Sequence, residues 1–412
     1  MKSANYKFPA YLLIIMSTVG FTLLCAANDW QTNVLYVGLG FLGLFLLIYS
    51  ILVICSMGDK FLVLIAFMLM TLGVLMLCRL DIVMGARQIV WIGIGGIVFF
   101  VTYCIFYNIR FWNRLWLLYA LGGVLLFTLT LILGKTVNGS RNWIDLGPIA
   151  FQPSEIIKIF YIMFLACKYS GSLNKPFLKI SPAFMTGIVT YIYILFLVIQ
   201  RDWGTILVVF LIFIFMIYVY EDVKWFLPAN IAAATIVAIL GYMFLYHIQV
   251  RVGVWLNPWE DVSNKGYQIA QSLFAIASGG YFGRGLGNGT PDYIPEVHTD
   301  FIFSAICEEM GVFGGAAVII LYFLFAYRCF KITLNTQNSY NKAVGLGLTI
   351  MFAIQTFIII GGVIKFIPLT GITLPFVSYG GTSIVVSFAS LGIMQAISAL
   401  EVRKGGAQTD DK

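Results

Sequence analysis

Long apolar runs, each close to the length of a membrane span, recur along this chain and limit what it can fold into. A helix needs about 20 apolar residues to cross a bilayer, where its backbone polar groups must be satisfied internally. The 412 residues are 60% hydrophobic and 10% charged, whereas soluble domains carry about 25% charged residues. The chain is therefore predicted to be an all-α, polytopic integral membrane protein. The runs predict twelve transmembrane helices, at 10–27, 33–55, 61–78, 89–107, 115–134, 155–170, 182–199, 204–220, 226–248, 301–327, 343–363 and 383–400.

The basic residues predict the orientation, because Lys and Arg favour cytoplasmic loops. With the N-terminus in the cytoplasm, the inner loops receive basic residues that include Lys60, Arg110, Arg114, Lys224, Arg328, Lys331 and Lys342. Both termini are then predicted to be cytoplasmic, and a large extracytoplasmic loop spans 249–300. The chain divides into N-terminal transmembrane helices (1–134), a core (135–400) that contains this loop, and a cytoplasmic tail (401–412).

Several classes of function are disfavoured by composition. None of the seven cysteines forms a CxxC pair, and the two histidines lie far apart, so no metal site is visible. The net charge of +7 comes without a basic run interleaved with aromatics, so no nucleic-acid partner is expected. The first apolar run lacks a convincing cleavage site, and we expect no cleavable signal peptide.

The polar loop 249–300 is the first candidate for chemistry, since it stands out in a largely apolar chain. Arg251 opens it, and Glu296, His298 and Asp300 close it just before the apolar residues of the next helix. A carboxylate at such a boundary is costly to keep unless it has a function. Asp300 could cap the helix that follows. It could equally be a general base with a raised pKa that accepts a proton from a sugar hydroxyl, and the residues alone leave both roles open.

A second candidate segment runs from 138 to 158. Ser154 and Glu155 resemble a helix start, and Glu155 and Lys158 share one helix face at a spacing that allows pairing. Arg141 and Lys158 could anchor a phosphate at the membrane surface. The alternative is an interfacial loop anchored by Trp143, with Glu155 and Lys158 as a satisfied pair.

Two further polar segments face the same outer side. Asp202, between two predicted helices, could orient a ligand, pair with Arg201 or simply belong to a tight turn. The segment 365–382 contains two prolines and three glycines and cannot form one uninterrupted lipid-facing helix. Non-helical backbone at this depth is tolerated where protein buries it or a cavity hydrates it, so this segment suits a groove wall from which Lys365 points at an anion.

Four groups of residues resemble the shape, elongation, division and sporulation (SEDS) family, which includes FtsW, RodA and SpoVE, and they appear in that family's order. They are Gly139-Ser140-Arg141 with Trp143 to Gly147 and Gln152-Pro153-Ser154-Glu155; Gly266-Tyr267-Gln268 with Gln271-Ser272-Leu273; Pro295-Glu296 with His298-Thr299-Asp300 and Phe301-Ile302-Phe303; and Leu374-Pro375-Phe376-Val377-Ser378-Tyr379-Gly380-Gly381. The chain departs from the family in two respects. Gln200-Arg201-Asp202-Trp203-Gly204-Thr205 stands where Gln-Pro-Asp-Leu-Gly-Thr is usual, and twelve predicted spans replace ten, which indicates an added N-terminal pair.

The resemblance implies a peptidoglycan glycosyltransferase that polymerises lipid II into glycan strands on the outer face of the bacterial cytoplasmic membrane. Asp300 of the His-Thr-Asp motif is then the expected catalytic base. The expected substrate-binding residues are Arg141, Glu155, Lys158, Asp202, Arg251, His298, Thr299, Lys365 and Ser378. Cations near a leaving undecaprenyl pyrophosphate would stabilise its developing charge, and an apolar groove would hold the polyprenyl chains.

Partners and alternatives follow from the same resemblance. Family members work with a class B penicillin-binding protein, a transpeptidase, so such a partner is expected beside lipid II and the growing glycan strand. A divalent cation could assist with pyrophosphate, although no cluster of ligands demands one. A lipid II flippase, or a scaffold that recruits a transpeptidase without catalysis, are the alternatives.

Overall fold

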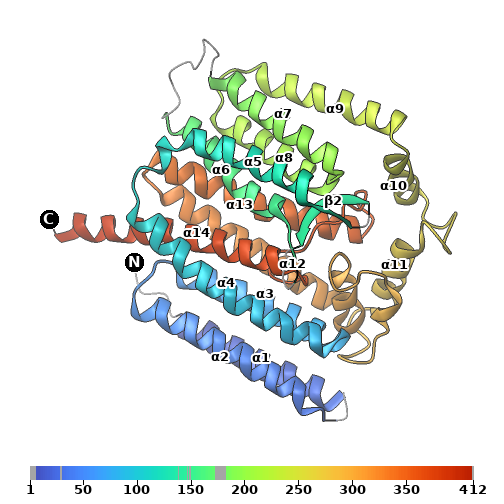
Figure 1. Cartoon of the computed structure of the whole chain (residues 1–412). Coiled ribbons are helices and arrows are strands. Elements are labelled where there is room, and N and C mark those ends of the chain that lie inside the picture. Colours follow the sequence, from blue (N-terminus) through green and yellow to red (C-terminus); the bar gives the residue numbers. More distant parts are fainter. Residues whose placement is uncertain are drawn as a thin grey trace.

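The computed structural model describes residues 6–27, 30–137, 139–145, 147, 150–171 and 182–410, and Figure 1 shows a bundle of long helices. The helices are α1 (Lys7–Ala27), α2 (Thr32–Ile54), α3 (Lys60–Leu80), α4 (Ile82–Asn108), α5 (Trp116–Leu133), α6 (Pro153–Tyr169), α7 (Pro182–Gln200), α8 (Trp203–Tyr220), α9 (Phe226–Phe244), α10 (Tyr246–Leu256), α11 (Tyr267–Gly279), α12 (Ile302–Asn335), α13 (Ser339–Val363) and α14 (Gly381–Asp410). Short 3₁₀ turns lie at Trp112–Arg114 and Pro291–Tyr293.

All twelve predicted runs are helical. Eleven helices in the described part of the chain are long and apolar enough to cross a membrane. The one predicted span outside these eleven is α6, which has 17 residues and carries Glu155, Lys158 and Lys168. The prediction of an all-α polytopic membrane protein is confirmed.

The structure differs from the predicted boundaries in several places. Among them, α4 begins at Ile82 rather than residue 89, and α12 extends to Asn335 rather than residue 327. The run predicted at 226–248 breaks at Leu245, which separates α9 from α10, and α11 forms inside the predicted loop. The interfacial loop expected near Arg141 is instead a small antiparallel sheet of β1 (Lys135–Val137), β2 (Ser140–Asp145) and β3 (Ala150–Phe151). Pairing these strands satisfies backbone groups that would otherwise lie unpaired near the membrane. The helix α14 continues to Asp410, beyond the predicted end at residue 400.

Small residues let the central helices approach closely, as is typical of membrane bundles. A Cβ on Gly95 of α4 would lie 2.4 Å from the Phe388 ring of α14, and one on Gly392 would lie 2.3 Å from the Thr102 hydroxyl. Thr102 also donates a hydrogen bond to the Ala389 carbonyl. The α4–α14 contact is therefore fixed by backbone proximity rather than by large side chains alone.

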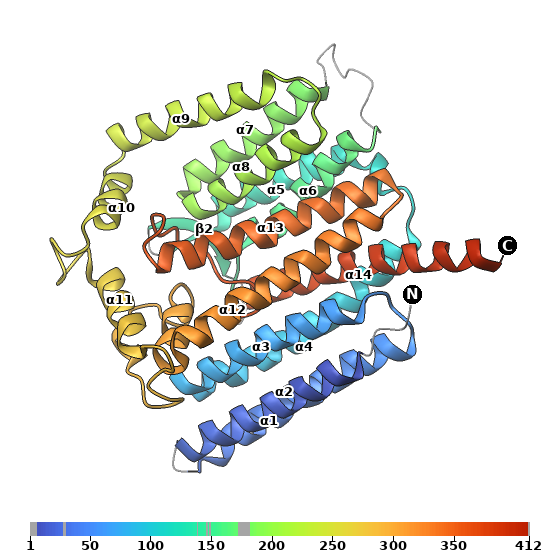
Figure 2. The same cartoon turned by 180° about the vertical axis from the view of Figure 1, so that it is seen from behind.

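The N-terminal pair α1 and α2 lies along α3 and α4, and is drawn in blue at one side of the bundle in Figure 2. Ser17 of α1 and Thr71 of α3 form a buried hydrogen bond of 3.1 Å between their hydroxyls. The first helix begins and the last helix ends at one end of the bundle, whereas α10, α11 and β2 lie at the opposite end, here called the loop end. The candidate site residues gather at the loop end.

Candidate active site

Asp300 lies in the turn that leads into α12. The amides of Thr299 and Asp300 both donate to the Glu296 carbonyl at 3.1 Å, which turns the chain sharply before the helix. The residue at the cap position of α12 is Phe301, and no side chain caps the helix. Of the two roles that the sequence left open for Asp300, helix capping is therefore not what this geometry shows.

The Asp300 carboxylate faces the segment 365–380. A Cβ on Gly371 would lie 3.4 Å from Oδ2 of Asp300, and Gly371 has φ +73°, which favours glycine. Burial raises the pKa of Asp300 to about 6; the charge of Glu296 adds to the rise, while the Thr299 hydroxyl and the charge of Arg251 oppose it. The residue as a whole is nevertheless partly exposed. Such a carboxylate can exchange protons near neutral pH.

The motif around Asp300 is fastened to the segment 374–379. Ser378 donates from its hydroxyl to the Thr299 carbonyl at 2.5 Å, and the Tyr379 amide donates to the His298 carbonyl at 2.9 Å. Ser378 is 1% exposed and also accepts from the Leu374 amide. Ser378 is therefore placed to position the backbone of the motif, whereas the His298 ring, partly exposed against Tyr379, is open to a ligand.

Arg251 and Lys365 hold α10 against the same segment. Arg251 donates from Nη1 to the carbonyls of Leu369 and Thr370, both at 3.2 Å. Lys365 donates from Nζ to the Leu256 carbonyl at 3.3 Å, and Trp255 donates to the Lys365 carbonyl at 3.2 Å. Two chain segments more than 100 residues apart are thereby joined, and the charge of Arg251 acts on Asp300.

Desolvation lowers the pKa of Arg251, and the charges of Asp300 and Asp202 partly oppose this. Since an arginine remains protonated in proteins, Arg251 stays a cation. Arg251 is therefore attracted to two carboxylates, that of Asp300 and that of Asp202 in the turn between α7 and α8.

Asp202 is a buried hub of hydrogen bonds. Its Oδ2 accepts from Asn142 Nδ2 at 3.2 Å, from Gln152 Nε2 at 3.2 Å and from Ser154 Oγ at 3.1 Å. Its Oδ1 accepts from the Thr205 amide and so caps α8. Because all of these donors are protein groups, the structure favours a role for Asp202 in joining β2, α6 and α8.

Glu155 and Lys158 form the ion pair that their spacing predicts. Lys158 Nζ lies 2.7 Å from Glu155 Oε1, and their side chains are 2% and 8% exposed, respectively. Arg141, by contrast, is exposed and donates to the carbonyls of Gly134 and Ile132 at 2.9 and 3.3 Å. These carbonyls lie at the C-terminus of α5, where a cation is favourable. Among the described residues, no hydrogen bond or ion pair joins Arg141 or Lys158 to Asp300.

A buried acidic pair on α12 was missed by the sequence reasoning. Glu309 lies 2.9 Å from Arg79 of α3 and accepts from the Gly287 amide. Glu308 accepts from the Thr290 amide and lies 3.4 Å from Arg284. The glycine-rich part of the outer loop is thus tied to α3 and α12. The signal was present, because two adjacent carboxylates inside an apolar run demand a partner.

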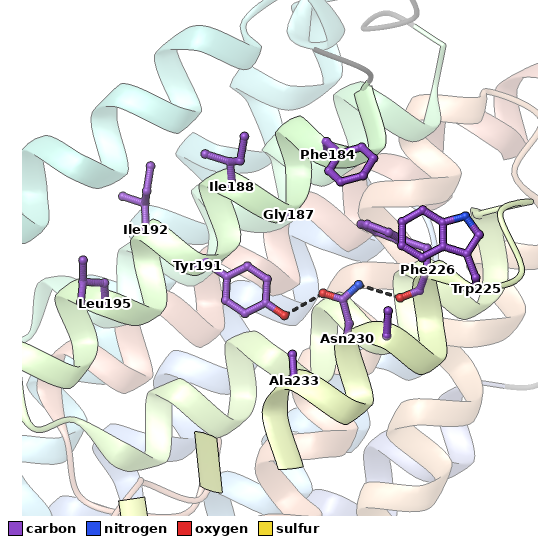
Figure 3. A pocket seen from close by; sticks show the side chains of 11 residues that line it. Phe184, Gly187, Ile188, Tyr191, Ile192, Leu195, Trp225, Phe226, Asn230 and Ala233 are labelled. Atoms are coloured by element: carbon purple, nitrogen blue, oxygen red, sulfur yellow. Dashed lines mark hydrogen bonds between the residues drawn. The ribbon is translucent and has the colours of Figure 1, made fainter. Parts of the chain in front are cut away.

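Two apolar cavities open between helices. One of about 570 Å³ lies between α7 and α9, where Tyr191 donates to Asn230 and apolar side chains line the rest (Figure 3). The other, of about 340 Å³, lies between α12 and α13 and reaches Phe366, the neighbour of Lys365. Neither is lined by Asp300, so the carboxylate sits outside the cavities suited to hydrocarbon chains.

The described residues contain no group of three or more His, Cys, Asp or Glu side chains that could hold a metal ion. Several charged groups at the loop end instead pair with one another or with backbone, among them Arg141, Arg251, Lys365 and the Glu155–Lys158 pair. The chemistry available there is proton transfer by a carboxylate beside fixed positive charges.

Comparison with known proteins gives consistent matches. A family model described as cell cycle protein, covering FtsW, RodA and SpoVE, matches residues 59–402. Stage V sporulation protein E of Bacillus subtilis is 34% identical over 364 residues, which cover 82% of this chain and 96% of that protein. Peptidoglycan glycosyltransferase RodA of Mycobacterium tuberculosis is 32% identical over 370 residues, covering 82% of this chain and 78% of that protein.

Solved structures match as well. A chain of a peptidoglycan synthase complex that coordinates polymerization and crosslinking has a TM-score of 0.70 and 26% identity, and covers 84% of this chain and 98% of that chain. The rod shape determining protein RodA of Thermus thermophilus has a TM-score of 0.62 at 26% identity, over 83% of this chain and 96% of that chain. The family match begins at residue 59, so α1 and α2 lie outside it.

Proposed function

The chain belongs to the SEDS family of FtsW, RodA and SpoVE proteins, and from this premise we propose that Asp300 is the base with which it polymerises lipid II. The protein is a multi-pass membrane peptidoglycan glycosyltransferase of the kind to which RodA and FtsW belong. The observation that carries the proposal is the position of Asp300 at the loop end, where the residue is partly exposed, its carboxylate faces Gly371 and the pKa of that carboxyl is about 6.

The proposed reaction is a displacement at the anomeric carbon of the donor sugar. The 4-hydroxyl of the acceptor GlcNAc loses its proton to the Asp300 carboxylate as its oxygen forms a bond to the anomeric carbon of the donor MurNAc. The bond from that carbon to the phosphate oxygen breaks, and undecaprenyl pyrophosphate leaves with the electron pair. Attack opposite the leaving group inverts the anomeric centre.

The environment of Asp300 suits this step. A general base works best when its pKa lies near the working pH, because the base is then both ionised and able to hold the proton. At pH 7 a group with a pKa of about 6 is roughly nine-tenths ionised. The link from Arg251 to Leu369 and Thr370 keeps the wall of the site in place beside Gly371 and Asp300.

Positive charge near the site supports departure of the pyrophosphate. Fixed charges aimed at developing negative charge lower the barrier, since they need no reorganisation during reaction. Arg251 and Lys365 are fixed in this way by backbone carbonyls, and we assign them to the substrate's phosphates. His298 and Thr299 are assigned to the sugar, and Arg141 to the headgroup at the rim. The buried Glu155, Lys158, Asp202 and Ser378 support the site's shape.

Three further assignments accompany the catalytic one. The loop end is placed outside the cell and both termini in the cytoplasm, in agreement with the basic residues of the opposite loops. A class B penicillin-binding protein is the proposed partner, because a structural relative belongs to a complex that coordinates polymerization and crosslinking. Apolar cavities between helices would accept polyprenyl chains.

The test is glycan synthesis from lipid II by the purified full-length protein, with and without the partner. Asp300→Ala is expected to abolish polymerisation while the protein remains folded. Asp292→Asn is the matched control, because Asp292 is an exposed acid in the same outer loop. Polymerisation at the wild-type rate by Asp300→Ala would overturn the assignment. Lipid II transport without synthesis by the wild-type protein would instead identify a flippase, and neither activity would identify a scaffold.

A further inference from the structure

The turn between α7 and α8 contains a strained arginine. Arg201 has φ +59°, a left-handed conformation. The Asp202 amide bonds to the Leu197 carbonyl and the Arg201 amide to the Val198 carbonyl, which ends α7 in a motif that normally places glycine at this position. A non-glycine residue in this conformation costs about 1–2 kcal/mol. Strained residues of this kind concentrate at functional sites.

The turn packs against α10. The Trp203 ring lies 5.0 Å from the His247 imidazole, centroid to centroid. His247 and Arg251 are four residues apart on α10 and therefore lie on one face of that helix. The contact of Trp203 thus brings the turn that carries Arg201 beside the helix that carries Arg251.

The charges of two arginines act on the imidazole of His247. Burial lowers its pKa, and the charges of Arg201 and Arg251 lower it further, which favours the neutral imidazole. Its Nε2 is buried and has no hydrogen-bond partner among the described residues. A buried polar atom without a partner is unfavourable, and so are two like charges acting on one site. An anion that accepts a hydrogen bond from Nε2 would relieve both conditions.

Arg201 differs from the other cations of the loop end in its partners. Arg141, Arg251 and Lys365 donate to backbone carbonyls, and Lys158 pairs with Glu155. The Arg201 side chain is exposed and makes no hydrogen bond or ion pair with any described residue. Its guanidinium therefore keeps its donors for a ligand, and planar guanidinium groups match phosphate oxygens well.

We propose that Arg201, Trp203 and His247 form, together with Arg251, a subsite for the diphosphate of the lipid-linked donor sugar. This inference rests on the proposed function. An in-line displacement places the base and the leaving oxygen on opposite sides of the anomeric carbon, so the diphosphate subsite should be close to Asp300 but separate from it. Arg251 meets this requirement, since it donates to the carbonyl of Thr370, next to the Gly371 that Asp300 faces, and shares one face of α10 with His247. Arg201 then adds affinity for the diphosphate.

The direct test measures binding of undecaprenyl diphosphate to the full-length protein in phosphatidylcholine nanodiscs. Asp300→Asn serves as the background so that nothing reacts. Arg201→Asn, chosen because asparagine tolerates the left-handed conformation, is expected to raise the Kd about tenfold, as for loss of one charge-assisted contact. His247→Ala is expected to raise it several-fold. Lys135→Gln, which removes the same charge from an exposed pair on the β1–β2 hairpin, should leave it unchanged.

Two further arms identify the ligand. Undecaprenyl monophosphate should bind more weakly than the diphosphate, and the difference should shrink in Arg201→Asn. Phosphatidylglycerol in the nanodiscs should compete only weakly. Equal competition by phosphatidylglycerol would show a general site for anionic lipids and overturn the proposal, as would an unchanged Kd in Arg201→Asn.

Turnover separates this inference from the proposed function. In the otherwise native protein, Arg201→Asn should raise the KM for lipid II while Asp300→Ala abolishes synthesis. If Asp300→Ala stops synthesis and Arg201→Asn binds the diphosphate like wild type, the subsite is wrong and the function stands. If Arg201→Asn weakens diphosphate binding but the wild-type protein makes no glycan, the subsite stands and the function is wrong.

Discussion

The acid limb of glycan synthesis should report the protonation of Asp300. With a pKa of about 6, the carboxylate is about nine-tenths ionised at pH 7 and about one-tenth ionised at pH 5, so kcat/KM should fall about tenfold between these values. An aspartate with an ordinary pKa of about 3.9 would lose almost nothing over this range. The raised pKa is therefore visible as a loss of activity well above pH 4.

The perturbation that tests the cause is Glu296→Gln. The Glu296 charge raises the pKa of Asp300, although burial is the larger cause. Removing this charge should move the acid limb to lower pH, by less than the whole rise. Glu296 is itself in a left-handed conformation with φ +55°, and glutamine preserves the length and shape of the side chain, so the turn should persist.

The assay is the initial rate of lipid II polymerisation by the full-length protein between pH 4.5 and 8, with kcat/KM measured because it reports the free enzyme. His298→Gln is the control, since an imidazole is the other kind of side chain that changes charge in this range and His298 adjoins Asp300. An acid limb that stays in place in Glu296→Gln and moves or disappears in His298→Gln would refute the assignment to Asp300.

Three other outcomes follow from the same contacts. The pKa of Asp300 is higher in the folded than in the unfolded protein, so the folded protein binds more protons between about pH 4 and 6 and its stability falls as pH rises through that window. Asp300→Asn should therefore unfold at a higher temperature than wild type at pH 8, with a gain in stability of at most about 3 kcal/mol. Below pH 4 this advantage should disappear. Glu155→Ala leaves the buried Lys158 unpaired and should lower the free energy of unfolding by about 3–5 kcal/mol. The double replacement of Glu155 by Leu and Lys158 by Met should lower it far less. Thermal unfolding in detergent measures both. Gly371→Ala should reduce polymerisation because its Cβ would contact the Asp300 carboxylate. Gly139→Ala is the control: Gly139 has φ +82° and no atom within 4 Å of an added Cβ, so this variant has the backbone strain without the contact and should retain activity in the same assay.

The sequence predicted the helices well because each span satisfies its own backbone and shows as a local apolar run. It also predicted the Glu155–Lys158 pair, which depends only on helical spacing. The partners of Arg251 and Lys365 could not be predicted, since they are carbonyl oxygens more than 100 residues away. A backbone carbonyl leaves no trace in the residue type that carries it. The sequence therefore indicated anion binding by these cations but not that the same side chains also hold the loops.

The same reasoning explains what was misjudged or missed at the loop end. The residues alone left Asp202 open between orienting a ligand, pairing with Arg201 and belonging to a tight turn, because its donors come from β2 and α6, which only the fold brings together. Glu308 and Glu309 were overlooked inside an apolar run, although their partners Arg79 and Arg284 are also charged. In both cases the sequence shows a carboxylate that needs partners, but not which distant residues the fold brings to it.

The two kinds of cation at this end of the molecule have different consequences for catalysis. The charge of Lys158 is balanced by that of Glu155, so the pair helps to hold the structure together but adds little to the electrostatic potential of the site. Arg251 and Lys365 donate to carbonyls, which fix the side chains without cancelling their charge. A fixed, uncancelled cation is what stabilises developing negative charge with little reorganisation. Positive potential at the loop end therefore originates in side chains that also hold the loops, and loosening those loops should lower the rate of synthesis even where no substrate contact is lost.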